Sequence, residues 1–349
     1  MKRFCIAVCL SFLPFVLWSQ QDVRNVILMI GDGMGLAHSY AAYLYNGDSL
    51  VMFTMPYTAF AITSCADRKV TDSGAGGTAI ATGHKTNYGC IGIDDKGVSR
   101  NSLLEIAKRA GKSTAMVCTS NITHATPASF MAHVSDRDLQ DSIALAYLSE
   151  NVDVVLGGGR DNFMPDKRKD GLNIADSLKE RGYAVVMNTD ELDEVESDRI
   201  VGLFADNHLE PFAKRGNFME KSMTKALDVV SDNEEGFFMM VEGSKIDMEA
   251  HDNRYERMID ELLDFDACVR IALDFAREDG HTLVVVVADH ETGGLALKSK
   301  DEGTECEWTS EDHTAIPVPV YAYGPGGEQF RGVIQNTDIF WKIYNLMIK

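Results

Sequence analysis

The sequence predicts an α/β fold of three layers, in which helices cover both faces of a large, mostly parallel central sheet. Two observations predict it. Short apolar runs without polar alternation recur along the chain, as expected of strands that are buried on both faces. Helix-like amphipathic stretches lie between many of these runs, and this alternation is typical of a parallel sheet with crossover helices.

The individual elements follow from the same patterns. The predicted strands are the apolar runs at residues 26–30, 114–118, 152–156, 184–187, 237–241, 283–288 and 318–323. The predicted helices are residues 102–109, 218–230, 255–277 and, near the C-terminal end, 337–347. The acidic run at 190–198 is interpreted as solvated loop or helix ends.

The first twenty residues have the pattern of a secretory signal. Lys2 and Arg3 precede an apolar run at 4–18, which Ser19 and Gln20 follow. An uncleaved membrane anchor is the alternative, but the run is shorter than the ~20 residues that a spanning helix needs. We expect a signal peptide at 1–20 and a single catalytic domain at 21–349. No later segment is long and apolar enough to span a membrane, so we expect an exported protein, periplasmic or extracellular.

The chain is strongly acidic, with a formal net charge of −20. Removal of the signal takes away two cations and no acid, which makes the charge more negative still. Nucleic-acid binding is therefore disfavoured. An acidic surface also repels anionic substrates, so a phosphate site must carry its own positive charge, which metal ions can supply.

The cysteines give little structural information. Two of the seven, Cys5 and Cys9, lie in the predicted signal. The remaining five are Cys65, Cys90, Cys118, Cys268 and Cys306. An odd number at irregular spacing, without a Cys-x-x-Cys pair, argues against a thiolate zinc site and a fully paired disulfide framework. One or two bridges stay open, and the pairing is not readable.

Acidic residues follow three of the predicted strands. Asp32 comes just after 26–30, Glu242 directly after 237–241, and Asp289-His290 directly after 283–288. Ligands of open parallel sheets bind outside the carboxyl ends of the strands. Each acid alone has the simpler interpretation of a helix cap or loop charge. Three gathered carboxylates would repel one another unless cations neutralised them, which predicts bound metal.

Further metal ligands lie near these acids in the sequence. Asp247 and His251 are four residues apart, so on a helix they share one face. As a lone pair they would be surface decoration, but Glu242 precedes them and His313 offers another imidazole before the strand at 318–323. Mixed histidine and carboxylate ligands suit zinc, and an all-oxygen set suits magnesium.

Ser73 begins a stretch of small residues at 73–83 that is predicted to open a helix. Such a start favours anions and allows close backbone approach. On this segment alone, Ser73 is either the helix cap or a nucleophile. A serine hydroxyl needs activation to be nucleophilic, and the proposed zinc cluster would provide it.

At this point the residues resemble the alkaline phosphatase family, over about 25–348. The motifs that carry the resemblance are 25–35 with Asp32, 71–83 with Ser73, His124-Ala-Thr126-Pro-Ala, Ser135-Asp-Arg137, 241–251, Ala288-Asp-His290 and Glu311-Asp-His313-Thr. Each motif is weak by itself, and their joint presence in family order is specific.

The resemblance implies a site with two zinc ions and one magnesium ion. The first zinc would take Asp247, His251 and His313. The second would take Asp289, His290, Ser73 and one oxygen of Asp32. Magnesium would lie on the other side of Asp32, with Glu242 and Thr126. Arg137 would hold two phosphate oxygens, oriented by Asp72.

The implied activity is hydrolysis of small phosphate monoesters through a phosphoserine at Ser73, with inorganic phosphate as product. A homodimer is implied only by the resemblance. Two positions depart from the best-known bacterial members, where an aspartate stands in place of His124 and a lysine in place of Met248. An imidazole at the third site could bind that metal or favour zinc or another transition ion, which leaves its identity open.

Two other classes of function stay open. A phosphodiesterase, a sulfatase or a phosphoglycerate mutase could share the scaffold, but the Cys/Ser-x-Pro-x-Arg motif of sulfatases is absent around Ser73, the phosphodiesterases usually carry threonine there, and the mutase is cytosolic. A secreted phosphate- or metal-binding protein without turnover is the other alternative. The presence of both Ser73 and Arg137 argues against it, because chelation requires neither.

Overall fold

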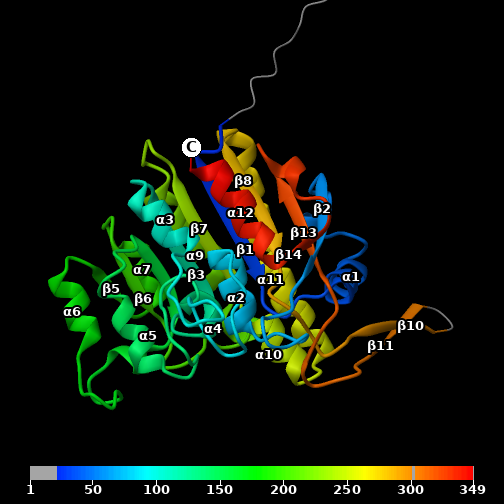
Figure 1. Cartoon of the computed structure of the whole chain (residues 1–349), viewed down its shortest axis with the longest axis horizontal. Coiled ribbons are helices and arrows are strands. Elements are labelled where there is room, and N and C mark those ends of the chain that lie inside the picture. The colour runs from blue at the N-terminus through cyan, green and yellow to red at the C-terminus, as the bar shows by residue number, and fades with distance from the viewer. Residues whose placement is uncertain (1–21, 301–302, 349) are drawn as a thin grey trace, which may run out of the picture.

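The computed structural model describes residues 22–300 and 303–348, so the predicted signal at 1–20 lies outside the described residues. A ten-stranded sheet forms the centre of the molecule (Figure 1). Its order is β14-β2-β13-β8-β1-β7-β3-β4-β6-β5. Strand β13 runs antiparallel to both of its neighbours, and every other neighbouring pair is parallel. The predicted large, mostly parallel sheet is confirmed.

All seven predicted strands are present, with ends that differ by a few residues at most. The strands of the sheet are β1 (Asn25–Gly31), β2 (Tyr57–Ile62), β3 (Ser113–Asn121), β4 (Val154–Gly158), β5 (Ala184–Val186), β6 (Ile200–Leu203), β7 (Phe237–Gly243), β8 (Thr282–Val287), β13 (Val318–Tyr323) and β14 (Gly332–Gln335). Two small ribbons pair β9 (Glu291–Thr292) with β12 (His313–Thr314), and β10 (Ala296–Lys300) with β11 (Gly303–Glu307). The β10–β11 hairpin projects from the body of the molecule (Figure 1).

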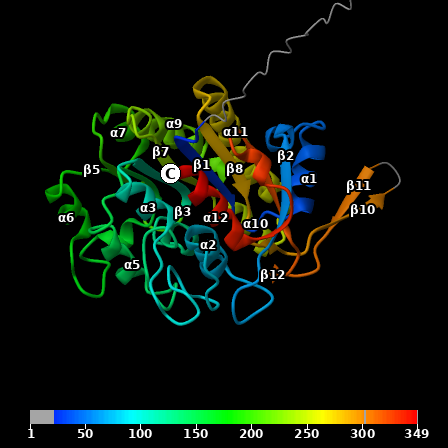
Figure 2. The same ribbon diagram turned by 45° about the horizontal axis from the view of Figure 1, so that its top comes forward.

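Helices cover both faces of the sheet, which completes the three predicted layers. One face carries α2 (Ser73–Thr82), α3 (Leu103–Arg109) and α12 (Asn336–Met347). The other carries α9 (Phe218–Val230) and α11 (Tyr255–Asp279), with α1 (Leu36–Tyr45) packed on α11 (Figures 1 and 2). The shorter helices are α4 (Ala125–Ala128), α5 (Gln140–Ala146), α6 (Ile174–Glu180), α7 (Thr189–Glu194), α8 (Phe212–Arg215) and α10 (Lys245–His251). Single 3₁₀ turns occur at Val51–Thr54, Arg160–Phe163 and Gly327–Gln329.

The central strands β8, β1 and β7 are buried along their whole lengths. Their apolar side chains are removed from water on both faces, which is why the sequence shows continuous apolar runs there rather than alternation. Burial of each such side chain contributes roughly 1.5–3 kcal/mol. These three neighbouring strands therefore form the buried middle of the sheet, and the acids of the sequence analysis lie at or just after their carboxyl ends.

Two further observations concern the cysteines and the membrane. The five cysteines of the described residues are free thiols, so the possible one or two bridges are not formed. Within residues 22–300 and 303–348, no helix is both long and apolar enough to cross a membrane.

Candidate metal centre and nucleophile

The strand-end acids meet because their strands are neighbours. Ile30 of β1 lies opposite Glu242 of β7 on one side and opposite Val287 of β8 on the other. Asp32 and Asp289 each come two residues after these paired positions. The structure therefore brings the three predicted carboxylates to one edge of the sheet, where all three are fully buried.

Asp247, His251 and His313 form a first cluster. The first two lie on the short helix α10, which the four-residue spacing anticipated. His251 Nε2 is 3.4 Å from Asp247 Oδ2 and 3.0 Å from His313 Nε2. His313 Nε2 is 3.7 Å from Asp247 Oδ1. One carboxylate and two imidazole nitrogens at this spacing can surround a single zinc ion.

A second cluster surrounds His290 beside Ser73. His290 Nε2 lies 3.4 Å from Asp32 Oδ1 and 3.5 Å from Asp289 Oδ2. The Ser73 hydroxyl oxygen is 3.2 Å from the same nitrogen. Of the four residues that the resemblance assigns to the second zinc, the other three thus lie within 3.5 Å of His290 Nε2.

A third cluster lies on the other side of Asp32. Ligand atoms of Asp32, Glu242 and His124 all lie within 4.8 Å of one another. His124 precedes α4, on which Thr126 lies. His124 Nδ1 and Thr126 Oγ1 are buried and make no hydrogen bond. The structure therefore places an imidazole beside the oxygen ligands of the predicted third site.

The carboxylates of these clusters have the properties of an anion-rich cavity that requires cations. Both oxygens of Asp32, Oε1 of Glu242 and Oδ2 of Asp289 are buried without a hydrogen bond. Burial raises the pKa of Asp32, and the charges of neighbouring carboxylates raise it further. Burial also raises the pKa of Glu242 to about 8 and that of Asp289 to about 6. Unpaired buried carboxylates are costly, so these residues fit divalent cations.

Ser73 is the first residue of α2, and the helix cap is its neighbour. Asp72 accepts hydrogen bonds from the backbone N–H groups of Gly74 and Ala75. The interpretation of Ser73 as the cap is therefore wrong, because Asp72 performs that role. The Ser73 hydroxyl faces His290 instead, at the positive end of the helix.

The small residues after Ser73 let α2 approach its neighbours closely. A Cβ atom on Gly76 would lie 2.8 Å from the backbone oxygen of Asp289, and one on Gly77 would lie 3.0 Å from Ser129 Oγ. Larger residues would push the helix away from the carboxyl end of β8. The glycines thus bring Ser73 next to the His290 cluster.

Arg137 is held beside Ser73 by two contacts. Its Nη1 donates to Asp72 Oδ2 at 2.8 Å, and its Nη2 is 3.3 Å from His124 Nε2. The backbone N–H of Arg137 donates to the oxygen of Gly89 at 2.8 Å. A guanidinium in this place has the planar fork that matches phosphate oxygens, as expected of Arg137 from the sequence.

Two nearby residues were not predicted. Thr292 donates from its hydroxyl to Asp247 Oδ1, and Asp312 lies within ligand distance of the His251–His313 pair. Thr292 is two residues after His290, and Asp312 directly precedes His313. Their closeness in sequence to these histidines is the signal that could have identified them. The ribbon of β9 and β12, which pairs Thr292 with His313, explains why they meet.

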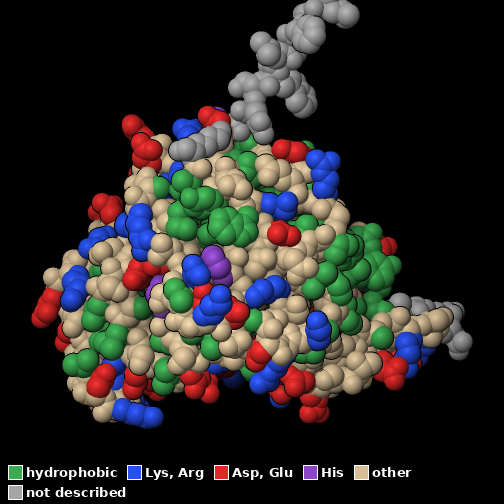
Figure 3. Space-filling view, in the orientation of Figure 1, with side chains coloured by type: hydrophobic (Ala, Val, Ile, Leu, Met, Phe, Trp, Pro, Cys, Tyr) green, Lys and Arg blue, Asp and Glu red, His purple; other side chains and the backbone are tan. Residues whose placement is uncertain are grey.

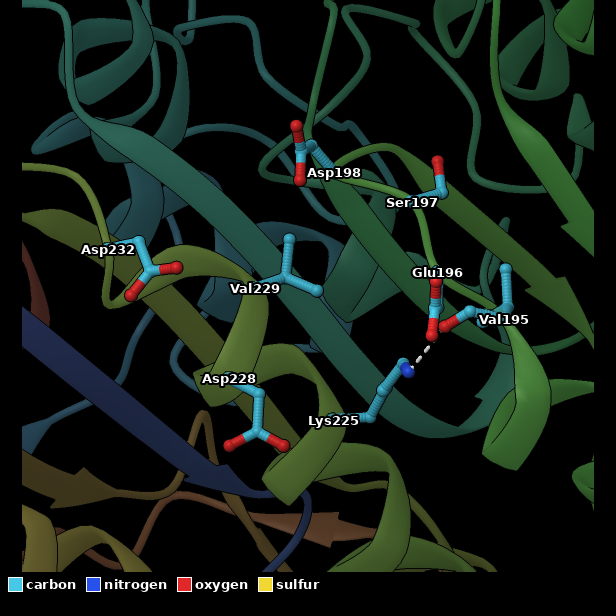
Figure 4. A pocket seen from close by; sticks show the side chains of 8 residues that line it. All are labelled: Val195, Glu196, Ser197, Asp198, Lys225, Asp228, Val229 and Asp232. Atoms are coloured by element: carbon cyan, nitrogen blue, oxygen red, sulfur yellow. Dashed lines mark hydrogen bonds between the residues drawn. The ribbon is translucent and has the colours of Figure 1, made fainter.

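The surface hollow in Figure 4 lies away from these clusters. It is lined by the residues Val195, Glu196, Ser197, Asp198, Lys225, Asp228, Val229 and Asp232. The first four of these residues precede β6. The others lie on the second half of α9 or just after it, before β7 begins, so the hollow is at the amino-terminal edge of the sheet. The metal clusters occupy the opposite, carboxyl-terminal edge. Part of the acidic run at 190–198 thus forms a solvated rim, and its first part forms α7.

Comparison with known proteins gives one consistent result. The sequence model of a family described as alkaline phosphatase matches residues 23–307 and 298–348. Alkaline phosphatase 4 of Bacillus subtilis is 36% identical over 405 residues, covering 91% of this chain and 87% of the relative. The alkaline phosphatase of Escherichia coli is 31% identical over 403 residues, covering 93% and 86%.

Solved structures agree. The alkaline phosphatase of the Antarctic bacterium TAB5 superposes with a TM-score of 0.89 and 35% identity, covering 94% of this chain and 99% of that one. A variant of that enzyme, in which a histidine is replaced by aspartate, has magnesium bound in its M3 site.

Proposed function

Since the chain belongs to the alkaline phosphatase family of phosphomonoesterases, we propose that Ser73 is its nucleophile and passes through a phosphoserine. One observation carries this assignment. The Ser73 hydroxyl, at the start of α2, lies 3.2 Å from His290 Nε2, within the cluster of buried carboxylates. Asp72, which precedes Ser73 in the chain, binds the Arg137 guanidinium at 2.8 Å.

We assign the metal ions to the three clusters. Asp247, His251 and His313 would hold one zinc ion, and Asp32, Ser73, Asp289 and His290 a second. Asp32, Glu242 and Thr126 would hold the third ion, which the resemblance gives as magnesium and whose identity depends on His124. The orphaned buried oxygens of Asp32, Glu242 and Asp289 support this assignment.

The reaction has two displacement steps. Bound divalent ions supply Lewis acidity, which lowers the pKa of a hydroxyl or water and stabilises the leaving oxygen. Ser73 Oγ forms a bond to phosphorus as the bond to the alcohol oxygen breaks, and the serine proton passes through solvent to the departing alcohol. Water then attacks the phosphoserine, and Ser73 regains its proton as inorganic phosphate leaves. Arg137 holds two phosphoryl oxygens through both steps.

His124 is proposed to decide which ion the third site prefers. An imidazole beside Asp32 and Glu242 favours zinc or another transition ion over magnesium. The magnesium-bound variant of the TAB5 enzyme, with aspartate in place of a histidine, is consistent with such control by one side chain.

Export and assembly are further parts of the proposal. We propose that residues 1–20 are a removed signal and that 21–349 form one exported catalytic domain. A homodimer is supported by an exposed apolar surface on α1 and β2, visible in Figure 3, to which Leu36, Tyr40, Tyr45 and Phe60 contribute. N-terminal sequencing of the exported protein and light scattering during gel filtration test these two points.

Trapping of the intermediate tests the central proposal. Protein incubated with radioactive phosphate at low pH, quenched and digested, should carry label on the peptide that contains Ser73. Ser73→Ala should lose the label and on the order of 10³-fold or more of p-nitrophenyl phosphate hydrolysis. The exposed Ser149→Ala serves as control. Near-normal hydrolysis by Ser73→Ala would exclude the mechanism, and preference for bis(p-nitrophenyl) phosphate would indicate a phosphodiesterase.

A further inference from the structure

Arg68 and Tyr88 form a stacked pair at the surface, outside the metal clusters. The guanidinium carbon of Arg68 lies 4.2 Å from the centre of the Tyr88 ring, a cation–π contact. The Arg68 side chain is 58% exposed and Tyr88 is 38% exposed. Both therefore offer surface to a molecule that approaches from solvent.

The pair is joined to the phosphate-binding groups through one residue. Gly89, which follows Tyr88, donates its N–H to Asp72 Oδ1 at 3.0 Å and accepts the N–H of Arg137 at 2.8 Å. Asp72 in turn binds the Arg137 guanidinium. Tyr88 therefore directly precedes Gly89, whose backbone contacts both Asp72 and Arg137.

The pair lies near the first cluster, whose ion would face the departing alcohol oxygen. Ser73 and the strand-end acids are buried, whereas the side chain of His251 is 34% exposed, so the first cluster forms the open side. His313 is bonded to the backbone oxygen of Thr71, adjacent to Asp72. Burial, with the charges of Asp72 and Asp312, raises the pKa of Tyr88, which agrees with its place near both.

Asp67 holds the pair in a fixed arrangement. Its Oδ1 accepts the backbone N–H of Tyr88 at 2.9 Å, and its Oδ2 is 3.6 Å from Arg68 Nε. A ring and a guanidinium that are already positioned lose little entropy when a ligand binds. This arrangement is that of a platform rather than of two unrelated surface side chains.

We propose that Arg68 and Tyr88 form a subsite for a flat aromatic ring in the alcohol part of the phosphate monoester. A tyrosine ring and a guanidinium plane both stack on such rings, and stacking is tolerant of which ring is bound. Asp67 and Asp312 disfavour an anionic alcohol at the same place. This inference rests on the proposed function, because it needs a phosphoryl group bound at Ser73.

Matched substrate pairs test the subsite and distinguish its two sources of ring. Adenosine 5′-monophosphate and ribose 5-phosphate share the ester bond and differ in the nucleobase. Benzyl phosphate and cyclohexylmethyl phosphate differ in whether the ring is flat. For each pair we expect the metal-loaded native enzyme to show a higher kcat/KM with the aromatic member. Tyr88→Ala and Arg68→Ala should lower this ratio by roughly five- to tenfold.

Controls separate the subsite from general damage. Tyr88→Phe should keep the ratio, and Leu172→Ala, which removes an exposed apolar side chain just before α6, should leave it unchanged. A fall confined to the nucleotide pair assigns a nucleobase, and a fall in both pairs assigns any flat ring.

Three results would overturn the inference. The first is a native ratio of kcat/KM, aromatic over non-aromatic member, that is no higher than the ratio in Tyr88→Ala. The second is an equal loss of kcat/KM with both members of a pair, and the third is a Tyr88→Phe variant that loses the ratio as well. Continued hydrolysis of ribose 5-phosphate would leave the phosphatase function intact in each case. A native enzyme that hydrolyses neither member would instead refute the proposed function and the subsite with it.

Discussion

The carboxylate of Asp72 binds Arg137 and at the same time caps the helix that begins with Ser73. Its Oδ2 accepts Nη1 of Arg137 at 2.8 Å, and its two oxygens accept the N–H groups of Gly74 and Ala75. The position of the guanidinium is therefore tied to the position of Ser73. Substitution of Asp72 or Arg137 should therefore change phosphate affinity more than it changes the stability of the fold.

Replacement of Arg137 should weaken phosphate binding. Arg137→Ala removes a bidentate, charge-assisted grip, so the inhibition constant for inorganic phosphate should rise roughly 10- to 100-fold. Arg137→Lys keeps the charge but not the planar fork and should fall between the two. Competition assays with p-nitrophenyl phosphate measure the constant, and an unchanged value in Arg137→Ala would exclude the assigned role.

Two substitutions of Asp72 should separate its two functions. Asparagine caps helices as well as aspartate does, so Asp72→Asn should unfold at nearly the native urea concentration. In Asp72→Ala the free energy of unfolding should fall by about 1 kcal/mol, because the cap is lost. Both should weaken phosphate inhibition by roughly three- to tenfold, because Arg137 loses a hydrogen bond. Native phosphate affinity in Asp72→Asn would show that the ion pair does not orient Arg137.

His124→Asp should change the metal content of the third site. A carboxylate in place of the imidazole completes an oxygen set with Asp32, Glu242 and Thr126, which magnesium prefers. After dialysis against equal zinc and magnesium, elemental analysis should show more magnesium and less zinc per chain than in the native protein. His208→Asn is the control, since His208 contacts the His124 ring edge-on. Identical metal contents would contradict control by His124.

The protein without metal should lose stability as the pH rises. Burial raises the folded-state pKa of Asp289 to about 6 and that of Glu242 to about 8, above the ordinary values near 4. A group whose pKa is raised in the folded state contributes its full stabilisation at pH values below its unfolded-state pKa. That contribution is lost as the pH rises through its folded-state pKa. The unfolding temperature of chelator-treated protein should therefore fall between about pH 4 and 8.

Metal-loaded protein should not show this fall, because cations neutralise the carboxylates. Glu242→Gln should remove the upper part of the fall in the chelated protein. Thermal unfolding followed by circular dichroism measures both. A gap between loaded and chelated protein that is the same at all pH values would refute the interpretation of the buried acids.

Local sequence patterns predicted most of the strands that are buried on both faces, and the acids that follow them. The buried strand β6 was missed, because its apolar run Ile200–Leu203 is only four residues long and contains Gly202. These patterns could not predict that β8, β1 and β7 are neighbours, because this order depends on pairing between residues more than 200 positions apart. They also missed β14 at the sheet edge and β2 beside it, where partial exposure removes the apolar run. The cap at Asp72 was missed because aspartate and serine are nearly equal as caps, and only the side-chain direction separates them.

The insertion of β13 between β2 and β8 has a consequence for biosynthesis. This strand follows His313 and is the last but one in chain order, and it pairs with β2 and β8, so His313 reaches the first cluster only after this late segment has joined the sheet. Such distant pairings are slow to form because loop-closure entropy opposes them. A partly made chain has Asp32 and Ser73 but lacks the histidines that would hold a metal ion beside them. Metal capture by the assigned residues would therefore wait until the segment that carries His313 has been made and has joined the sheet.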